Sequence, residues 1–282
     1  MLAALAAGEP TLAKPILVRA PRTVVVLAQK WADAYNKEHP DAEIEVTSGG
    51  PDAGLIALQR NKADLALSPR KIKPAESQDY ARMYGRRLRE YRVAVDSLCV
   101  YVNAENPVSE LDLGQIAKIF TGKIRNWKQV GGADVPITVY GREASSGAYE
   151  FLRTQVLQGA DFVSGAQPMP SAASVLKAVT RDKQGIGFAG AATSPAVRAL
   201  KIKKTPDSTA VESTEENLLG GRYPISRFLY AYLNPVLDRG EVGAFIDWIR
   251  SDEGQKIARE TGCHPLPPNW REKTYAGTNN KP

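Results

Sequence analysis

Residues 16–68, ILVRAPRTVVVLAQKWADAYNKEHPDAEIEVTSGGPDAGLIALQRNKADLALS, alternate between strand and helix patterns. ILVRA (16–20) is a short β-rich run, and the residues after it form one apolar helical stripe that contains Val24, Leu27, Ala28, Trp31 and Tyr35. Two more β-rich runs, at 42–48 and 63–68, enclose a second helical pattern at 55–60. Strand, helix, strand, helix, strand in this order predicts a parallel sheet with right-handed crossovers.

The turns that follow these three strands are rich in glycine, proline and basic residues. They read RAPRT (19–23), SGGPDAG (48–54) and SPRKIK (68–73). Ligands of parallel sheets bind at the carboxyl ends of the strands. We therefore expect the three turns to face one crevice.

The rest of the chain predicts a second unit and a return to the first. A helix is expected at 113–120, a strand at 137–141 and one amphipathic helix at 241–260. Two long β-rich runs, near 97–103 and 226–233, are interpreted as strands that cross between two lobes. One lobe would then come from both ends of the chain and the other from its middle, with a cleft between them.

GREASSGAYEFL, at 141–152, combines hydrogen-bond donors with the start of an apolar helical pattern. Arg142 offers a permanently charged fork of donors, Ser145 and Ser146 offer hydroxyls, and Gly147 allows close approach to the backbone. If a helix begins at Ser146 or Gly147, its first N–H groups would suit a phosphate-like anion. An ordinary N-cap at Ser146 is the other interpretation, and the residues alone leave both open.

Composition limits the classes of function. With 282 residues, of which 43% are hydrophobic, the chain can form one large domain or two moderate ones with a real core. Its net charge of +6 is concentrated in RMYGRRLREYR (82–92), which is interpreted as a loop entering an edge strand, and no nucleic-acid module is present. No apolar run approaches the roughly 18 residues that a membrane span needs.

The reactive residue types show no catalytic or metal-binding pattern. Cys99 and Cys263 are far apart, and neither they nor His39 and His264 show the spacing of metal ligands. No nucleophile is paired with a base, so we expect no metal, no cofactor and no enzyme activity. Whether the two cysteines form a disulfide stays open. MLAALAAGEPTLAKP (1–15) is interpreted as a truncated signal or a flexible start, because it lacks a basic first region.

Several stretches resemble the phosphate-binding proteins of bacterial ABC importers, which belong to the periplasmic binding protein superfamily. They are LDLGQIAKIFTGKIRNWKQVGG (111–132), GREASSG (141–147), QGIGFAG (184–190), YPISRFLYAYLN (223–234) and GCHPLP (262–267). The match extends over roughly residues 16 to 270, and several motifs keep both order and spacing.

The resemblance implies an α/β protein with the two-lobed, type II periplasmic-binding-protein fold. Each lobe would be a mainly parallel sheet flanked by helices, and two hinge strands would join the lobes. Lobe 1 would contain residues 16–101 and 226–282, and lobe 2 residues 102–225. The implied function is to hold inorganic phosphate or a related oxyanion between the lobes and deliver it to the permease subunits of an ABC transporter. We expect a monomer in the periplasm or outside the cell.

The resemblance also implies a set of ligand-binding residues. Thr23 matches a hydroxyl in the family's first loop, and Ser68 matches the serine after the third strand. Arg142 would make charge-assisted contacts to the anion from the second lobe. The full set of candidates is Thr23, Asp52, Ser68, Arg142, Ser145, Ser146, Gly147 and Ala148.

The chain departs from the family's pattern in its ligand loops. Ala20-Pro21 stands where the family usually has Gly-Ser, Pro51-Asp52-Ala53 where it has Ser-Gly-Thr, and Ala148 where it has threonine. Asp52 would either accept the proton of a hydrogen-phosphate or cap a helix. Two classes of function therefore stay open. One is a phosphate or oxyanion binder, and the other is a relative that has lost phosphate binding and serves as a sensor, a scaffold or a binder of another ligand.

Overall fold

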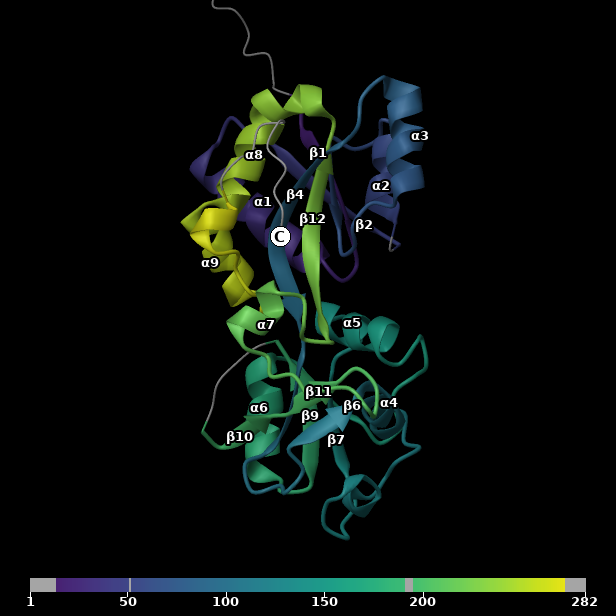
Figure 1. Cartoon of the computed structure of the whole chain (residues 1–282). Helices are drawn as coiled ribbons and strands as arrows, with labels where there is room; N and C mark the ends of the chain where they lie inside the picture. The colour runs from purple at the N-terminus through teal and green to yellow at the C-terminus, as the bar shows by residue number, and fades with distance from the viewer. Residues whose placement is uncertain (1–13, 51, 191–194, 272–282) are drawn as a thin grey trace, which may run out of the picture.

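Two five-stranded sheets organise the chain, and each lies at the centre of one of two lobes stacked end to end (Figure 1). The computed structural model describes residues 14–50, 52–190 and 195–271. In the first sheet the strand order is β2-β1-β3-β12-β4. Its strands are β1 (Ile16–Pro21), β2 (Ile44–Gly49), β3 (Leu65–Ser68), β4 (Arg89–Ser97) and β12 (Ser226–Leu233).

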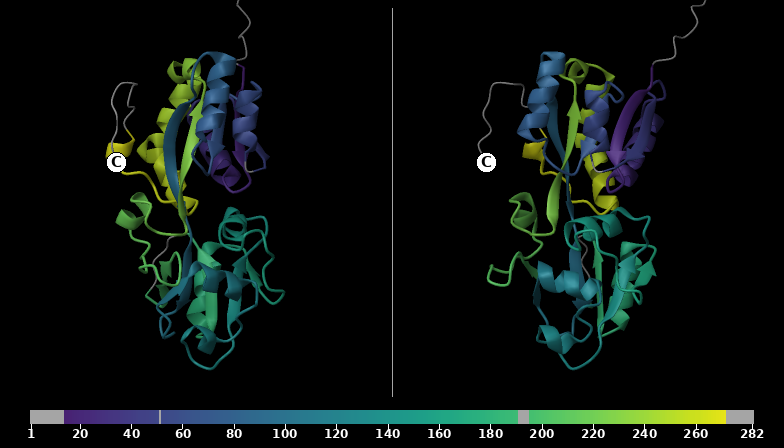
Figure 2. Two further views of the ribbon diagram at one scale, coloured as in Figure 1. Left: turned by 45° about the vertical axis from the view of Figure 1, so that its right-hand side comes forward. Right: turned by 90° about the vertical axis from the view of Figure 1, so that its right-hand side faces the viewer.

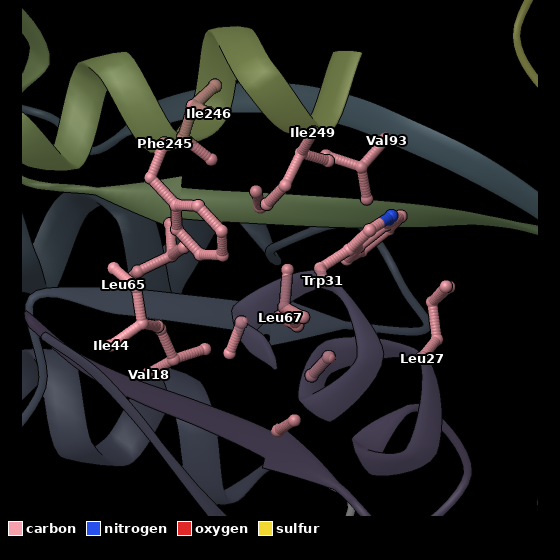
Figure 3. Close-up of a cluster of buried hydrophobic side chains, with 14 of the residues drawn as sticks. Val18, Leu27, Trp31, Ile44, Leu65, Leu67, Val93, Phe245, Ile246 and Ile249 are labelled. Carbon is pink, nitrogen blue, oxygen red and sulfur yellow. The ribbon is translucent and has the colours of Figure 1, made fainter. Parts of the chain in front are cut away.

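Helices cover both faces of the first sheet (Figure 2). One face packs on α1 (Val25–Glu38), α8 (Glu241–Arg250) and α9 (Asp252–Glu260), and the other on α2 (Ala53–Gln59) and α3 (Pro74–Tyr84). In Figure 3, Trp31 of α1 and Phe245 of α8 lie over the strands, and both side chains are almost fully buried. Burying a large apolar side chain contributes about 1.5–3 kcal/mol, so this layer anchors the strands that end at the site.

The second sheet has the strand order β10-β5-β9-β7-β8. Its strands are β5 (Cys99–Asn103), β7 (Thr138–Arg142), β8 (Gln167–Met169), β9 (Gly185–Ala189) and β10 (Val197–Ala199). The helices α4 (Leu113–Phe120) and α5 (Gly147–Gln155) pack on one face, and α6 (Ala172–Arg181) packs on the other. A small parallel pair, β6 (Glu110–Asp112) and β11 (Lys201–Lys203), and the short helix α7 (Glu215–Leu219) complete this lobe.

Two adjacent crossings join the lobes. β4 of the first sheet ends at Ser97 and β5 of the second begins at Cys99, so the first crossing is at Leu98. The chain returns at Ser226, which pairs with Ser97 at the start of the antiparallel β12–β4 ladder. Because the two connections lie side by side, they join the lobes at one edge only. Away from this edge the two lobes face each other.

The predicted two-lobed α/β class is confirmed, with two differences in detail. Antiparallel strands extend the parallel part of each sheet, so both sheets are mixed rather than mainly parallel. The single helix expected at 241–260 is two helices, because Ser251 is extended (φ −70°, ψ 175°) and its side chain accepts a hydrogen bond from the Gly254 N–H. Most of the predicted segment 1–15, and Pro51, lie outside the described residues.

Candidate functional site

A cavity of about 670 Å³ lies between the two lobes. Lobe 1 contributes Thr23 and residues of α1 and α9, and lobe 2 contributes the residues just before and at the start of α5 and α6. Arg142, Ser145, Ser146, Gly147 and Ala148 all line it, so the structure brings together six of the eight predicted site residues when Thr23 is included. We call it the Arg142 cavity.

Arg142 is the last residue of β7, and its guanidinium forms no ion pair with a carboxylate of the described residues. Its Nε donates to the Met169 carbonyl oxygen at 3.2 Å, and its Nη2 donates to the Pro170 carbonyl oxygen at 3.2 Å. None of the ion pairs found among the described residues includes this side chain. Burial lowers the pKa of Arg142 from its ordinary value, and the Glu143 carboxylate opposes the shift. The guanidinium is thus held in place by two carbonyl oxygens, with no direct ion pair to a carboxylate of the described residues.

The N-terminus of α5 faces the same space. Ser146 is its N-cap, and the Ser146 side chain accepts a hydrogen bond from the Tyr149 N–H at 3.1 Å. The predicted N-cap is confirmed, and it is compatible with anion binding because the N–H groups of Gly147 and Ala148, in the first turn, have no intrahelical acceptor. A helix N-terminus favours negative charge, so α5 and Arg142 act on an anion in the same sense.

Thr23 and Gly147 form the contact between the lobes at this point. A Cβ built on Gly147 would lie 2.7 Å from the Thr23 carbonyl oxygen, which is too close for any other residue without a shift. The Thr23 hydroxyl oxygen is buried and has no hydrogen-bond partner. An unmade hydrogen bond on a buried hydroxyl is costly, so a ligand oxygen beside Thr23 would remove that cost.

A largely buried ion pair lies at the hinge, next to the cavity. The Nε and Nη2 atoms of Arg227 donate to Oδ2 of Asp96 at 3.0 and 2.8 Å. Burial raises the pKa of Asp96, and Arg227 opposes this rise. The same guanidinium lies 3.8 Å from the centroid of the Phe151 ring in α5. The pair therefore connects the hinge strands to the helix whose N-terminus lines the site.

A second cavity, of about 470 Å³, lies on the other side of Thr23. Gly49, Gly50, Asp52 and Arg70 line it from the turns that follow β2 and β3, and we call it the Arg70 cavity. The turn after β1 and residues of α5 also line it. The Arg70 guanidinium has acidic partners. Arg70 contacts Asp52 at 2.7 Å and makes two hydrogen bonds to Glu76, at 2.9 and 2.7 Å.

Two predicted site residues have other partners. Asp52 occupies the N-cap position of α2, but its side chain makes no capping hydrogen bond, so the predicted helix cap is wrong. Arg70 takes the carboxylate instead, because its fork can bind Asp52 and Glu76 together. Ser68 lines neither cavity, and its buried hydroxyl donates to the Arg70 carbonyl oxygen at 2.8 Å.

The sequence did not identify several polar residues of the Arg142 cavity, among them Lys30, Ser97 and Arg259. Lys30 and Arg259 line it from α1 and α9, and Ser97 lines it at the hinge. Ser97 is 1% exposed, and its hydroxyl oxygen has no hydrogen-bond partner. No local pattern marks these residues, because only the folding of distant segments brings them to one space.

The reactive residues form no second site. Cys99 and Cys263 are both free thiols, so they do not form a disulfide. Among the described residues no cluster of three or more His, Cys, Asp or Glu side chains could hold a metal ion. Within the same ranges, no helix is both long and apolar enough to cross a membrane.

Residues 6–253 match the family model described as the PBP superfamily domain. The chain belongs to this superfamily. It is 31% identical over 268 residues to the phosphate-binding protein PstS of Pseudomonas aeruginosa, which covers 89% of this chain and 83% of that protein. The family resemblance seen in the sequence is thereby confirmed.

Solved structures of the superfamily share the fold. A possible phosphate-binding protein from Planctomyces limnophilus superposes with a TM-score of 0.84 at 24% identity, over 93% of this chain and 96% of that one. A putative phosphate ABC transporter substrate-binding protein from Clostridium perfringens, solved with bound phosphate, gives a TM-score of 0.57 at 28% identity, over 90% of this chain and 100% of that one.

Proposed function

We propose that this member of the PBP superfamily is an extracytoplasmic solute-binding protein that binds inorganic phosphate in the Arg142 cavity. It passes the phosphate to the permease subunits of an ABC importer. The protein acts in the periplasm or outside the cell and carries out no catalysis. The relatives named PstS and the phosphate-bound neighbour support this function.

The observation that carries the proposal is the uncompensated Arg142 guanidinium beside the N-terminus of α5. A partly buried cation without a counter-charge is unfavourable, and a phosphate dianion would supply that charge together with acceptors for several donors. The donors available are the guanidinium, the N–H groups of Gly147 and Ala148, and the Thr23 hydroxyl. Because they come from both lobes, binding would draw the lobes together.

The alternative is a relative that has lost phosphate binding. It is favoured by the missing hydroxyls at Ala53 and Ala148. The carboxylate of Asp52 no longer argues for it, because its ion pair with Arg70 offsets the repulsion that Asp52 would exert on an anion.

Isothermal titration calorimetry decides between the two functions. Protein freed of ligand by unfolding and refolding is titrated with phosphate and, separately, with sulfate. We expect phosphate to bind with a Kd of about 1 μM or tighter, which corresponds to at least roughly 8 kcal/mol. No heat from either anion, with a refolded protein of native circular dichroism, would contradict the proposal.

A further inference from the structure

Two helices begin side by side at the Arg142 cavity. β7 and β8 are parallel neighbours in which Arg142 is in register with Met169, and they lead into α5 and α6 respectively. Neighbouring strands lie about 4.8 Å apart, so the two helix N-termini are adjacent at one edge of the sheet. Arg142 lies between them, because its guanidinium binds the carbonyl oxygens of Met169 and Pro170, just before α6.

The N-terminus of α6 is a second set of donors in the cavity. Ser171 is the N-cap, and its hydroxyl accepts from the Ser174 N–H at 3.1 Å. The N–H groups of Ala172 and Ala173, in the first turn, therefore have no intrahelical acceptor, as in α5. Pro170, Ser171 and Ala172 line the same cavity as Arg142. If the ligand is a single phosphate at the N-terminus of α5, it supplies no acceptor for the N–H groups at the start of α6.

Ser97 is independent evidence for a second polar group in the ligand. It lines the cavity, is 1% exposed and has a hydroxyl oxygen with no hydrogen-bond partner. Thr23 is the other lining residue whose hydroxyl lacks a partner, and it belongs to the loop that contacts α5. A buried hydroxyl at the hinge gains a hydrogen bond if the ligand extends beyond the phosphoryl group.

The lining also contains cations other than Arg142. The charged residues are Lys30, Arg142, Arg259, Asp96, Glu143 and Glu260. Asp96 is neutralised by Arg227. Neither Lys30 nor Arg259 takes part in any ion pair found among the described residues. Once Asp96 is paired, three cations remain against the two carboxylates of Glu143 and Glu260, and two of these cations, Lys30 and Arg259, lie on the lobe 1 wall.

We propose that the Arg142 cavity binds a phosphomonoester that carries a carboxylate. The phosphoryl group lies at the N-terminus of α5, and the carboxylate lies at that of α6, within reach of Ser97 and the lobe 1 cations. This inference rests on the proposed function and names a wider class of substrate for the same site.

The size and apolar lining of the cavity fit such a ligand. Its volume of about 670 Å³ falls within the range of roughly 300–1,000 Å³ that is typical of small-molecule sites. Val26, which is 50% exposed, and Leu27 and Leu98 offer an apolar wall for the carbon atoms that link the two groups.

The test is calorimetry on ligand-free protein with inorganic phosphate, methyl phosphate and 2-phosphoglycolate. Methyl phosphate is the matched control, since it has the ester carbon and no carboxylate. We expect phosphoglycolate to bind about tenfold more tightly than methyl phosphate, or roughly 1.4 kcal/mol. Ser97→Ala should lower this ratio about threefold, as expected for one neutral hydrogen bond. Arg259→Gln should also lower the ratio, whereas Lys256→Gln, on α9 outside the cavity lining, should not.

The outcomes separate this inference from the function on which it rests. Binding of inorganic phosphate together with equal or weaker binding of phosphoglycolate than of methyl phosphate overturns the inference alone. A ratio that is unchanged in both Ser97→Ala and Arg259→Gln also overturns it. If none of the three compounds binds, the proposed function is overturned, and the inference with it.

Discussion

The Arg142 and Arg70 cavities lie on either side of Thr23 and are built from similar parts. Each contains an arginine that follows a β-strand and a helix start close by. The two cavities differ in the groups that the arginine guanidinium binds. Arg70 binds the carboxylates of Asp52 and Glu76, whereas Arg142 binds two backbone carbonyl oxygens and no carboxylate.

The pKa values of the two arginines shift in opposite directions for this reason. Hydrogen bonding to Glu76, with a further contribution from Asp52, raises the pKa of Arg70, whereas burial lowers that of Arg142. A cation whose charge is already paired stabilises the fold and gains little from another anion. One that is desolvated without an ion-pair partner gains most from a bound anion, so we propose a structural role for Arg70 and ligand binding for Arg142.

The largest expected effect is that of Arg142→Ala. We expect it to weaken phosphate binding by about 2 to 5 kcal/mol, the range found when one partner of a buried charge pair is truncated. The free energy of unfolding without ligand should not fall, because the substitution removes an uncompensated charge. Calorimetry and urea denaturation measure the two quantities. Equal phosphate affinity in variant and wild type would place the anion elsewhere.

The next effect is that of Gly147→Ala, at the contact between the two lobes. The new Cβ would lie 2.7 Å from the Thr23 carbonyl oxygen, so α5 has to move away from the first-lobe loop. Overpacking of this kind costs about 1 to 3 kcal/mol, and we expect that loss in phosphate affinity. Gly165→Ala is the control, because a Cβ there meets nothing within 4 Å. An affinity equal to that of the control would show that this contact is not part of the site.

A smaller effect, on stability instead of binding, is expected for Arg70→Gln. Its ion pairs are partly exposed, with 28% of the Arg70 side chain and 50% of the Asp52 side chain accessible, so their loss should cost about 1 kcal/mol or less. Phosphate affinity should change far less than in Arg142→Ala. A loss of affinity as large as that of Arg142→Ala would break the assignment of separate roles.

The smallest expected effect is on the stability of the fold at acidic pH. The hydrogen bond from Arg70 lowers the pKa of Glu76 below its ordinary value of 4.5. A lowered pKa stabilises the fold above the ordinary value, and the stabilisation is lost as the pH falls through the lower, folded-state value. In urea denaturation at a series of pH values, the stability difference between wild type and Glu76→Gln should shrink below pH 4.5. A difference that stays constant with pH would mean that Arg70 does not hold Glu76 ionised.

Much of the fold, and the main residues of the Arg142 cavity, could be predicted from local patterns. The ion pairs of the Arg70 cavity could not. The alternation of residues 16–68 predicts the strands and helices of lobe 1, and Arg142 and Ser146 lie together in a short motif at a helix start. The break at Ser251 had a signal, since a serine followed by two acidic residues is typical of a helix N-terminus.

The rest depends on contacts between distant segments. The partner of Asp52 is Arg70, from the turn after another strand, and nothing in either turn specifies that pairing. Ser97 and Arg259 line the Arg142 cavity only because the hinge strand and α9 of lobe 1 lie beside the start of α5 in the folded chain. Hydrogen-bond patterns of this kind follow from tertiary packing, whereas periodicity reports only on single elements.

A crystal structure of the protein with arsenate, a phosphate analogue whose arsenic atom scatters anomalously, tests the central claim most directly. We predict one strong anomalous peak in the Arg142 cavity, within hydrogen-bond distance of the Arg142 guanidinium, the Thr23 hydroxyl and the N–H groups of Gly147 and Ala148. A peak whose nearest cation is Arg70, with Arg142 still bound only to the Met169 and Pro170 carbonyl oxygens, would contradict the account.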